Sequence, residues 1–178
     1  MKAAQSFLNA LRALEELKRL GIIEDYAVAG AMALVFWTEP IPTYDLAVLV
    51  FLAEQEAPIV SLGSIYQWAA ARGYPVDGEH VIVEGLPVQF LPSHNELADE
   101  AIEKAATLDY EGVAVRVARP EYLVALYLEP SARTSKRRER AAALIEAPGT
   151  DRSLVQELIH RFRLEPERWG TDLDPLRS

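Results

Sequence analysis

The stretch Thr43-Tyr44-Asp45-Leu46-Ala47-Val48-Leu49-Val50 predicts the central strand of this chain. The run from Leu46 to Leu52 is apolar throughout, which is typical of a strand covered on both faces. Side chains two residues apart in a strand project from the same face, so Asp45 and Ala47 share one. That face therefore carries a carboxylate at the first position and only a methyl group at the second.

Strand-like and helical patterns alternate around this segment. Apolar residues at helical spacing predict a first helix from Ala4 to Leu20, which Gly21 ends. Alternating apolar residues on both sides of Glu84-Gly85 predict a hairpin with strands at 80–83 and 86–91, although Pro87 weakens the pairing there. Two further strands are expected at 26–29 and 113–117.

The remaining segments are predicted to be helical. They are 31–37, 61–72 capped by Ser61, 93–106 with a capping box of Ser93 and Glu96, 120–128 opened by Pro120, 135–146 and 151–162. This order indicates an α+β domain with a small mixed sheet flanked by helices and with C-terminal helices. We expect an α+β core over 1–130, a C-terminal helical extension of the same domain over 131–170, and a polar tail over 171–178.

The composition excludes several classes of function. A chain of 178 residues, half of them apolar and a quarter charged, is typical of one compact domain. It has no cysteine, which excludes disulfides, thiolate metal sites and cysteine nucleophiles. The longest apolar stretch, Tyr26 to Trp37, is too short to span a bilayer, and the N-terminus has no apolar signal core. A net charge of −9 argues against broad binding to nucleic acid or to anionic membrane surfaces, so we expect neither as a partner. The default expectation for such a chain is a cytoplasmic protein.

Four segments resemble the nucleotidyltransferase fold of the DNA polymerase β superfamily. The signature is carried by Tyr26–Ala33 (YAVAGAMA) and, after a spacer with Pro40, by Thr43–Ala47 (TYDLA). Gly85–Leu91 is similar to the family's strand with a third aspartate, and Pro120–Leu126 to its proline-glutamate helix. The branch that the chain resembles most is the minimal nucleotidyltransferase group, which includes abortive-infection toxins.

The resemblance implies a cleft for a nucleoside triphosphate and two Mg²⁺ ions. Magnesium demands oxygen ligands, and the family supplies three carboxylates. Here only Asp45 stands at a carboxylate position, with Ala47 at the second and Gln89 at the third. The resemblance thus gives Asp45 as a residual catalytic and metal-binding residue, and it gives Gly30, Ala31 and Thr43 as cofactor-binding candidates.

Three later positions also differ from the residues that the family usually has. Where the family carries a lysine and then two acids, this chain has Tyr127, Arg137 and Arg140. We therefore expect a degenerate site that has lost two-metal nucleotidyl transfer, a pseudoenzyme without cofactor. It would act as a binding or interaction module, with a second copy or another protein as partner and a nucleotide as candidate ligand.

The alternative is a divergent active enzyme that transfers a nucleotide from a triphosphate, with Mg²⁺, to a hydroxyl of a protein, an RNA or a small molecule. It needs replacement carboxylates, and the candidates by sequence position are Glu39, Asp77, Glu79 and Glu84.

Several of these residues also have purely structural interpretations. Asp45 is equally compatible with a cap or a strand-edge carboxylate. Gly30 is more typical of a hinge between strand and helix than of phosphate binding. The basic run from Arg133 to Arg140 is typical of a solvated helix face. His80, His94 and His160 are isolated in the sequence, which argues against a histidine metal site.

Overall fold

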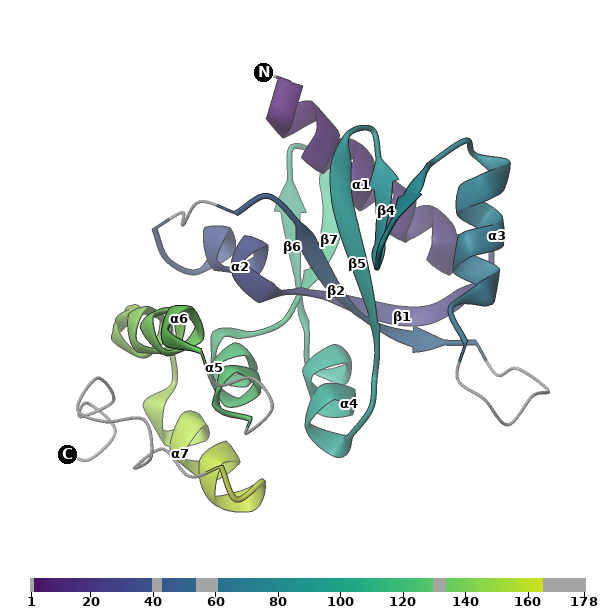
Figure 1. Cartoon of the computed structure of the whole chain (residues 1–178). Coiled ribbons are helices and arrows are strands. Elements are labelled where there is room, and N and C mark those ends of the chain that lie inside the picture. The colour runs from purple at the N-terminus through teal and green to yellow at the C-terminus, as the bar shows by residue number, and fades with distance from the viewer. Residues whose placement is uncertain (1, 40–42, 54–60, 130–133, 165–178) are drawn as a thin grey trace.

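The computed structural model describes residues 2–39, 43–53, 61–129 and 134–164. Its centre is a seven-stranded mixed sheet in the order β3-β4-β5-β2-β1-β7-β6 (Figure 1). The strands are β1 (Ile23–Ala29), β2 (Leu46–Leu52), β3 (Val76–Asp77), β4 (His80–Val83), β5 (Leu86–Pro92), β6 (Ala106–Tyr110) and β7 (Val113–Val117). The helices are α1 (Lys2–Arg19), α2 (Gly30–Ala33), the 3-10 turn η1 (Leu34–Phe36), α3 (Gly63–Ala71), α4 (Glu96–Glu103), α5 (Pro120–Leu128), α6 (Ser135–Glu146) and α7 (Arg152–Arg161). The predicted α+β class is confirmed, and β2 is the middle strand of the sheet as its apolar run predicts.

The register of the central strands fixes which side chains share a face. β2 runs antiparallel to β1 and parallel to β5, and Ala47 lies opposite Gln89 while Leu49 lies opposite Leu91. Neighbouring strands are about 4.8 Å apart, so these four side chains form one contiguous patch. Ala29, at the end of β1, pairs with Ala47 from the other side.

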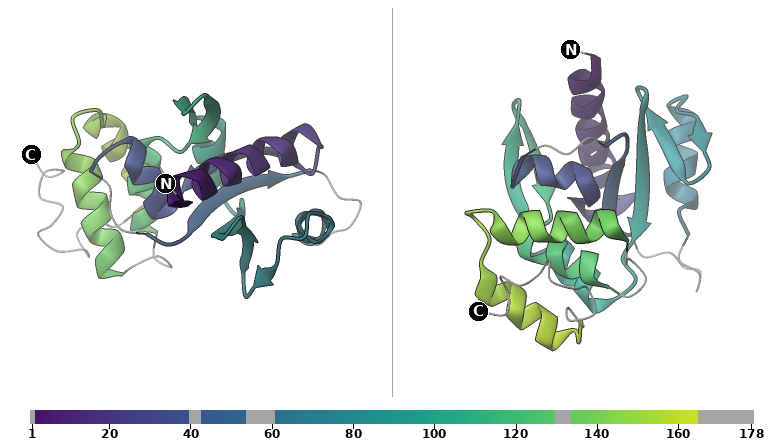
Figure 2. Two further views of the ribbon diagram at one scale, coloured as in Figure 1. Left: turned by 90° about the horizontal axis from the view of Figure 1, so that it is seen from above. Right: turned by 60° about the vertical axis from the view of Figure 1, so that its left-hand side comes forward.

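The helices cover the sheet in two groups, as Figure 2 shows from two sides. Helix α1 packs against β1, β4, β5 and β7 and buries Leu11, Leu14 and Leu17 completely or nearly so. The C-terminal helices gather at one end of the molecule, where α5 packs against α4, α6 and α7. Helix α5 is the core of this group, since most of its side chains are buried.

A buried carboxylate of α5 holds the start of α7. Glu121, in the first turn of α5, is 1% exposed, and its Oε1 accepts a hydrogen bond of 2.8 Å from the backbone N–H of Asp151. Asp151 in turn caps α7, because its side chain accepts from the N–H groups of Ser153 and Leu154. The start of α5 therefore sets the position of α7.

The cap predicted for α4 is wrong. Asn95, and not Ser93, precedes the helix, and its Oδ1 accepts from the N–H of Ala98 at 2.9 Å. The Ser93 hydroxyl instead donates to the carboxylate of Asp99. Asparagine caps as well as serine does, so the choice depends on where β5 ends.

The edges of the sheet also differ from the prediction. The segment expected to continue α4 to residue 106 ends at Glu103, and Ala106–Tyr110 forms β6, which pairs with β7. The short strand β3 was not expected either. The helix predicted over 31–37 is split into four residues of α2 and the 3-10 turn η1. The predicted hairpin at Glu84-Gly85 is confirmed, and both residues have the positive φ that a two-residue turn requires.

Some expectations fall outside the described residues. These are the ones on Pro40, on Arg133 and on the tail 171–178, and the proposed domain boundaries stay a prediction. Within the described part of the chain, no helix is long and apolar enough to cross a membrane.

Candidate functional site

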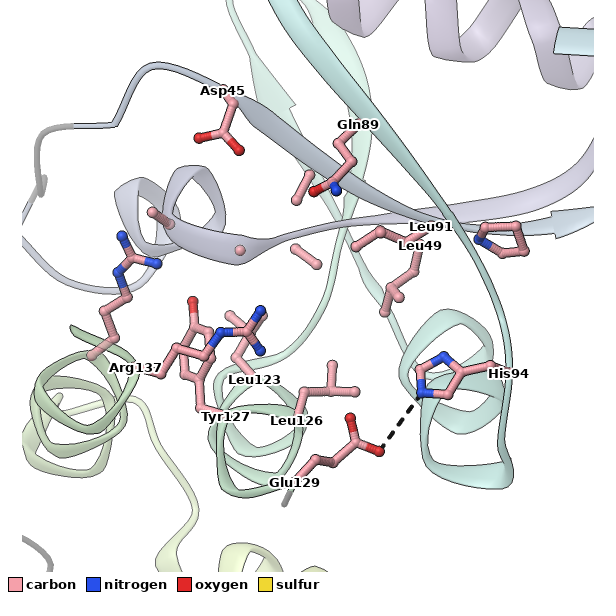
Figure 3. A pocket seen from close by; sticks show the side chains of 16 residues that line it. Asp45, Leu49, Gln89, Leu91, His94, Leu123, Leu126, Tyr127, Glu129 and Arg137 are labelled. Atoms are coloured by element: carbon pink, nitrogen blue, oxygen red, sulfur yellow. Dashed lines mark ion pairs between the residues drawn. The ribbon is translucent and has the colours of Figure 1, made fainter. Parts of the chain in front are cut away.

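A cleft of about 360 Å³ lies between the central strands and the C-terminal helices (Figure 3). Its floor comes from β2 and β5, one end from the β1–α2 junction, and the opposite wall from α5 and α6. The lining residues are Ala29, Gly30, Ala31, Asp45, Ala47, Leu49, Gln89, Leu91, Pro92, His94, Leu123, Leu126, Tyr127, Glu129, Arg137 and Arg140.

The three positions that resemble a carboxylate set meet in this cleft. Asp45 lies just before β2, and Ala47 and Gln89 are direct neighbours on β2 and β5. Figure 3 shows the Asp45 and Gln89 side chains on the same side of the strands. Of the three, only Asp45 offers a charged oxygen, because alanine has no ligand atom and glutamine offers a neutral amide.

Thr43 contacts the carboxylate of Asp45 and does not face the cleft. Its hydroxyl lies 3.0 Å from Oδ1 of Asp45 and donates to it. Thr43 is not among the lining residues, so the structure places this cofactor-binding candidate beside Asp45 and outside the cleft surface.

Gly30 has a structural reason to be glycine. Its φ is +60°, a left-handed conformation that other residues rarely adopt. A Cβ atom at this position would lie 2.9 Å from the Cβ of Ala47, closer than real Cβ contacts. The β1–α2 junction therefore approaches β2 too closely for a side chain at residue 30. Ala31 follows as a buried residue that also lines the cleft.

The wall from α5 and α6 carries the positive charge of the cleft. Arg137 and Arg140 lie three residues apart on α6 and therefore share one face of the helix. The guanidinium carbon of Arg137 lies 6.0 Å from the ring centroid of Tyr127 on α5. Burial raises the pKa of Tyr127 to about 12, while Arg140 and Arg137 act in the opposite direction. Tyr127 is therefore a protonated phenol, a hydrogen-bond donor, at neutral pH.

The far end of the cleft was not predicted from the sequence. Glu129, just after α5, accepts a hydrogen bond of 2.6 Å from Nδ2 of Asn95, and its Oε1 lies 3.9 Å from Nε2 of His94. The apolar floor next to it comes from Leu49 and Leu91. These two leucines follow Ala47 and Gln89 by two residues. The alternation of side chains along a strand could therefore have predicted that they share the cleft face.

The candidate replacement carboxylates do not line the cleft. Asp77 and Glu79 lie on or beside β3, and Glu84 lines a separate surface hollow with Asn9 and Arg12. Glu39 is exposed and is likewise absent from the lining. The sequence-based idea that Glu79 or Glu84 reaches inward from the hairpin is therefore wrong, because the hairpin lies at the outer side of β5.

Comparison with known proteins identifies the fold. Among solved structures, the chain is similar to the antibiotic-resistance factor ANT(2'')-Ia, an aminoglycoside nucleotidyltransferase. The TM-score is 0.55, with 96% of this chain and 95% of that chain covered at 16% sequence identity. The fold is that of a nucleotidyltransferase.

At this identity the likeness supports the nucleotidyltransferase fold and carries no substrate across. No protein-family model matches the sequence, and no curated protein does. The minimal, abortive-infection toxin-like branch stays a prediction. What the nucleotidyltransferase fold does in this chain has to be argued from the cleft.

Proposed function

We propose that this nucleotidyltransferase-fold protein is a metal-independent binding module that has lost two-metal nucleotidyl transfer. The observation that carries the proposal is the register of β2 and β5, which sets the methyl group of Ala47 beside the amide of Gln89 on the cleft floor. Two-metal transfer needs several anionic oxygens at this point of the fold to hold two divalent cations together. Asp45 alone supplies one carboxylate.

The donor set does not fit magnesium. Within the described residues, no group of three or more histidines, aspartates and glutamates is placed to hold a metal ion. The second carboxylate of the cleft, Glu129, is engaged by Asn95 and lies beside His94. The wall opposite the floor adds two arginines, Arg137 and Arg140, whose positive charge further opposes a cation in this space.

Two measurements test the proposal: the binding of metal ions and the transfer of a labelled nucleotide to an acceptor. The wild-type chain is titrated calorimetrically with Mg²⁺ and Mn²⁺ in the presence of ATP, and it is incubated with labelled nucleotides and candidate acceptors. We expect neither metal-dependent binding nor transfer of label. Transfer that requires Mg²⁺ and is abolished by Asp45→Asn would overturn the proposal and establish the alternative, a divergent active enzyme.

A gain-of-function variant tests the same reasoning in the other direction. Ala47→Asp combined with Gln89→Asp places three carboxylates around the cleft floor, since both positions line it next to Asp45. We expect this double variant to bind Mn²⁺, measured by calorimetry. The matched control is Ala47→Asn with Gln89→Asn, which has a similar size and no added charge. Equal metal binding by the two double variants would show that charge at these positions is not what the site lacks.

A further inference from the structure

Within the described residues the hydroxyl of Tyr127 has no hydrogen-bond acceptor, and the guanidinium of Arg140 beside it can only donate. Tyr127 is only 4% exposed, and burying an unsatisfied hydroxyl is costly, so such groups need an explanation. The other buried tyrosines do have acceptors. The hydroxyl of Tyr26 lies 2.5 Å from Oε1 of Glu15, and that of Tyr122 lies 3.0 Å from Oε2 of Glu100. Figure 3 shows the Tyr127 side chain extending from α5 toward the strands that carry Asp45 and Gln89, and its hydroxyl oxygen is buried at the wall of the cleft.

In the described part of the chain, two arginines beside this hydroxyl have no carboxylate partner. Arg137 and Arg140 are half-buried, and within the described residues neither forms an ion pair with a carboxylate. This contrasts with the similarly half-buried Arg116, whose Nε lies 2.9 Å from Oδ1 of Asp25. Taking a charged group out of water is costly unless it is paired. Within the described residues, two guanidinium groups of the cleft wall therefore have no carboxylate partner, and the buried phenol beside them has no acceptor.

The rest of the cleft indicates the size and shape of the missing ligand. The floor beyond Gln89 is apolar, formed by Leu49 and Leu91, with Leu126 on the facing helix. A volume of about 360 Å³ is at the small end of small-molecule pockets, too small for a nucleic-acid strand. The overall charge of −9 also disfavours a polyanion spread over the surface.

We propose that the cleft binds a small phosphorylated molecule whose phosphate lies against Arg137, Arg140 and the Tyr127 hydroxyl, without a metal ion. Arginine suits this role because its planar guanidinium donates two parallel hydrogen bonds to phosphate oxygens, and a phenol adds a third donor. The apolar floor then takes a flat, uncharged part of the same molecule. The inference rests on the proposed loss of two-metal transfer, because here the arginines supply the positive charge that metal ions would supply.

The test uses the full-length chain in EDTA with three probes: AMP, adenosine and inorganic phosphate. Binding is measured by calorimetry and by the shift in unfolding temperature at matched ionic strength. We expect inorganic phosphate to raise the unfolding temperature more than chloride does, and AMP to bind about tenfold or more tighter than adenosine.

Four single variants localise the phosphate. Arg137→Gln and Arg140→Gln are each expected to weaken AMP binding about tenfold or more, because each removes a charged donor, and Tyr127→Phe about two- to tenfold, because it removes a neutral one. Lys136→Gln is the matched control, since it removes the same charge from the same helix at an exposed residue outside the cleft. We expect it to change binding less than twofold. The unfolding temperature of each free variant shows that it is folded.

The outcomes separate this inference from the proposed function. The inference is overturned if neither phosphate nor AMP acts in EDTA, if adenosine binds as well as AMP, or if Lys136→Gln weakens binding as much as the two cleft variants do. In those cases an absence of nucleotidyl transfer still leaves the proposed function in place. Binding that requires Mg²⁺ and leads to transfer of label overturns both.

Discussion

Replacing Gly30 by alanine tests how the site is built. Alanine at a φ of +60° costs about 1–2 kcal/mol because its Cβ crowds the backbone. The new methyl group would also lie 2.9 Å from the Cβ of Ala47, and overpacking of this kind typically costs about 1–3 kcal/mol. We expect Gly30→Ala to lower the free energy of unfolding by about 2–5 kcal/mol.

Gly73 provides a matched control for the conformational part of this cost. Its φ is +71°, and a Cβ at this position would meet no atom within 4 Å. Gly73→Ala should therefore cost only about 1–2 kcal/mol. The difference between the two variants measures the contact with Ala47 separately from the backbone conformation.

A double-mutant cycle isolates that contact. Ala47→Gly removes the methyl group and by itself costs about 0.5–1 kcal/mol in a strand. In this background, Gly30→Ala should cost no more than Gly73→Ala does, which corresponds to a coupling energy of about 1–3 kcal/mol. Urea unfolding followed by far-UV circular dichroism measures all five proteins. If Gly30→Ala costs no more than Gly73→Ala, or if Ala47→Gly gives it no relief, the close approach of the β1–α2 junction to β2 is not what requires glycine.

Three further predictions concern the C-terminal helices. The folded chain holds the Tyr127 proton up to about pH 12, whereas the unfolded chain releases it near pH 10.0, so the stability that this residue contributes is full below pH 10.0 and is lost as the pH rises toward 12. Tyr127→Phe should therefore reduce the fall in urea midpoint over that range, by up to about 2–3 kcal/mol in unfolding free energy, and an unchanged fall would contradict the buried environment of the phenol. Glu121→Ala should cost about 1–3 kcal/mol, because it leaves the N–H of Asp151 without its acceptor, and Glu121→Gln, which keeps an acceptor oxygen, should cost less in the same unfolding experiment. Leu123→Ala removes a side chain that is 1% exposed and should cost about 2–5 kcal/mol, and a cost below 1 kcal/mol would show that α5 is not tightly packed.

The centre of the fold could be predicted because its signals are local. The apolar run of β2 specifies a doubly covered strand by itself, and Glu84-Gly85 specifies a two-residue turn by the conformations that it allows. The edge strand β6 carries no such signal. Its residues alternate between exposed and half-buried, so neither apolar content nor periodicity separates Ala106–Tyr110 from the end of the preceding helix.

The site could be predicted only where two strands determine it. Ala47 and Gln89 face one cleft because adjacent strands align their alternating side chains, and the resemblance to the nucleotidyltransferase signature indicated which residues to compare. The far end of the cleft depends instead on tertiary packing. Glu129 meets His94 and Asn95 only because the end of α5 lies beside the end of β5, a contact between residues more than 30 positions apart.

The charges on the two sides of the cleft indicate which kind of ligand it favours. A site for two divalent cations needs several anionic oxygens around the space that the ions occupy. Here Ala47 and Gln89 are uncharged positions of the floor beside the carboxylate of Asp45, and Arg137 and Arg140 lie on the facing wall. Two arginines that face uncharged residues favour an anion over a cation next to that wall. The uncharged residues at 47 and 89 and the arginines of α6 are therefore the two observations behind the proposal that this cleft holds a phosphate without metal ions.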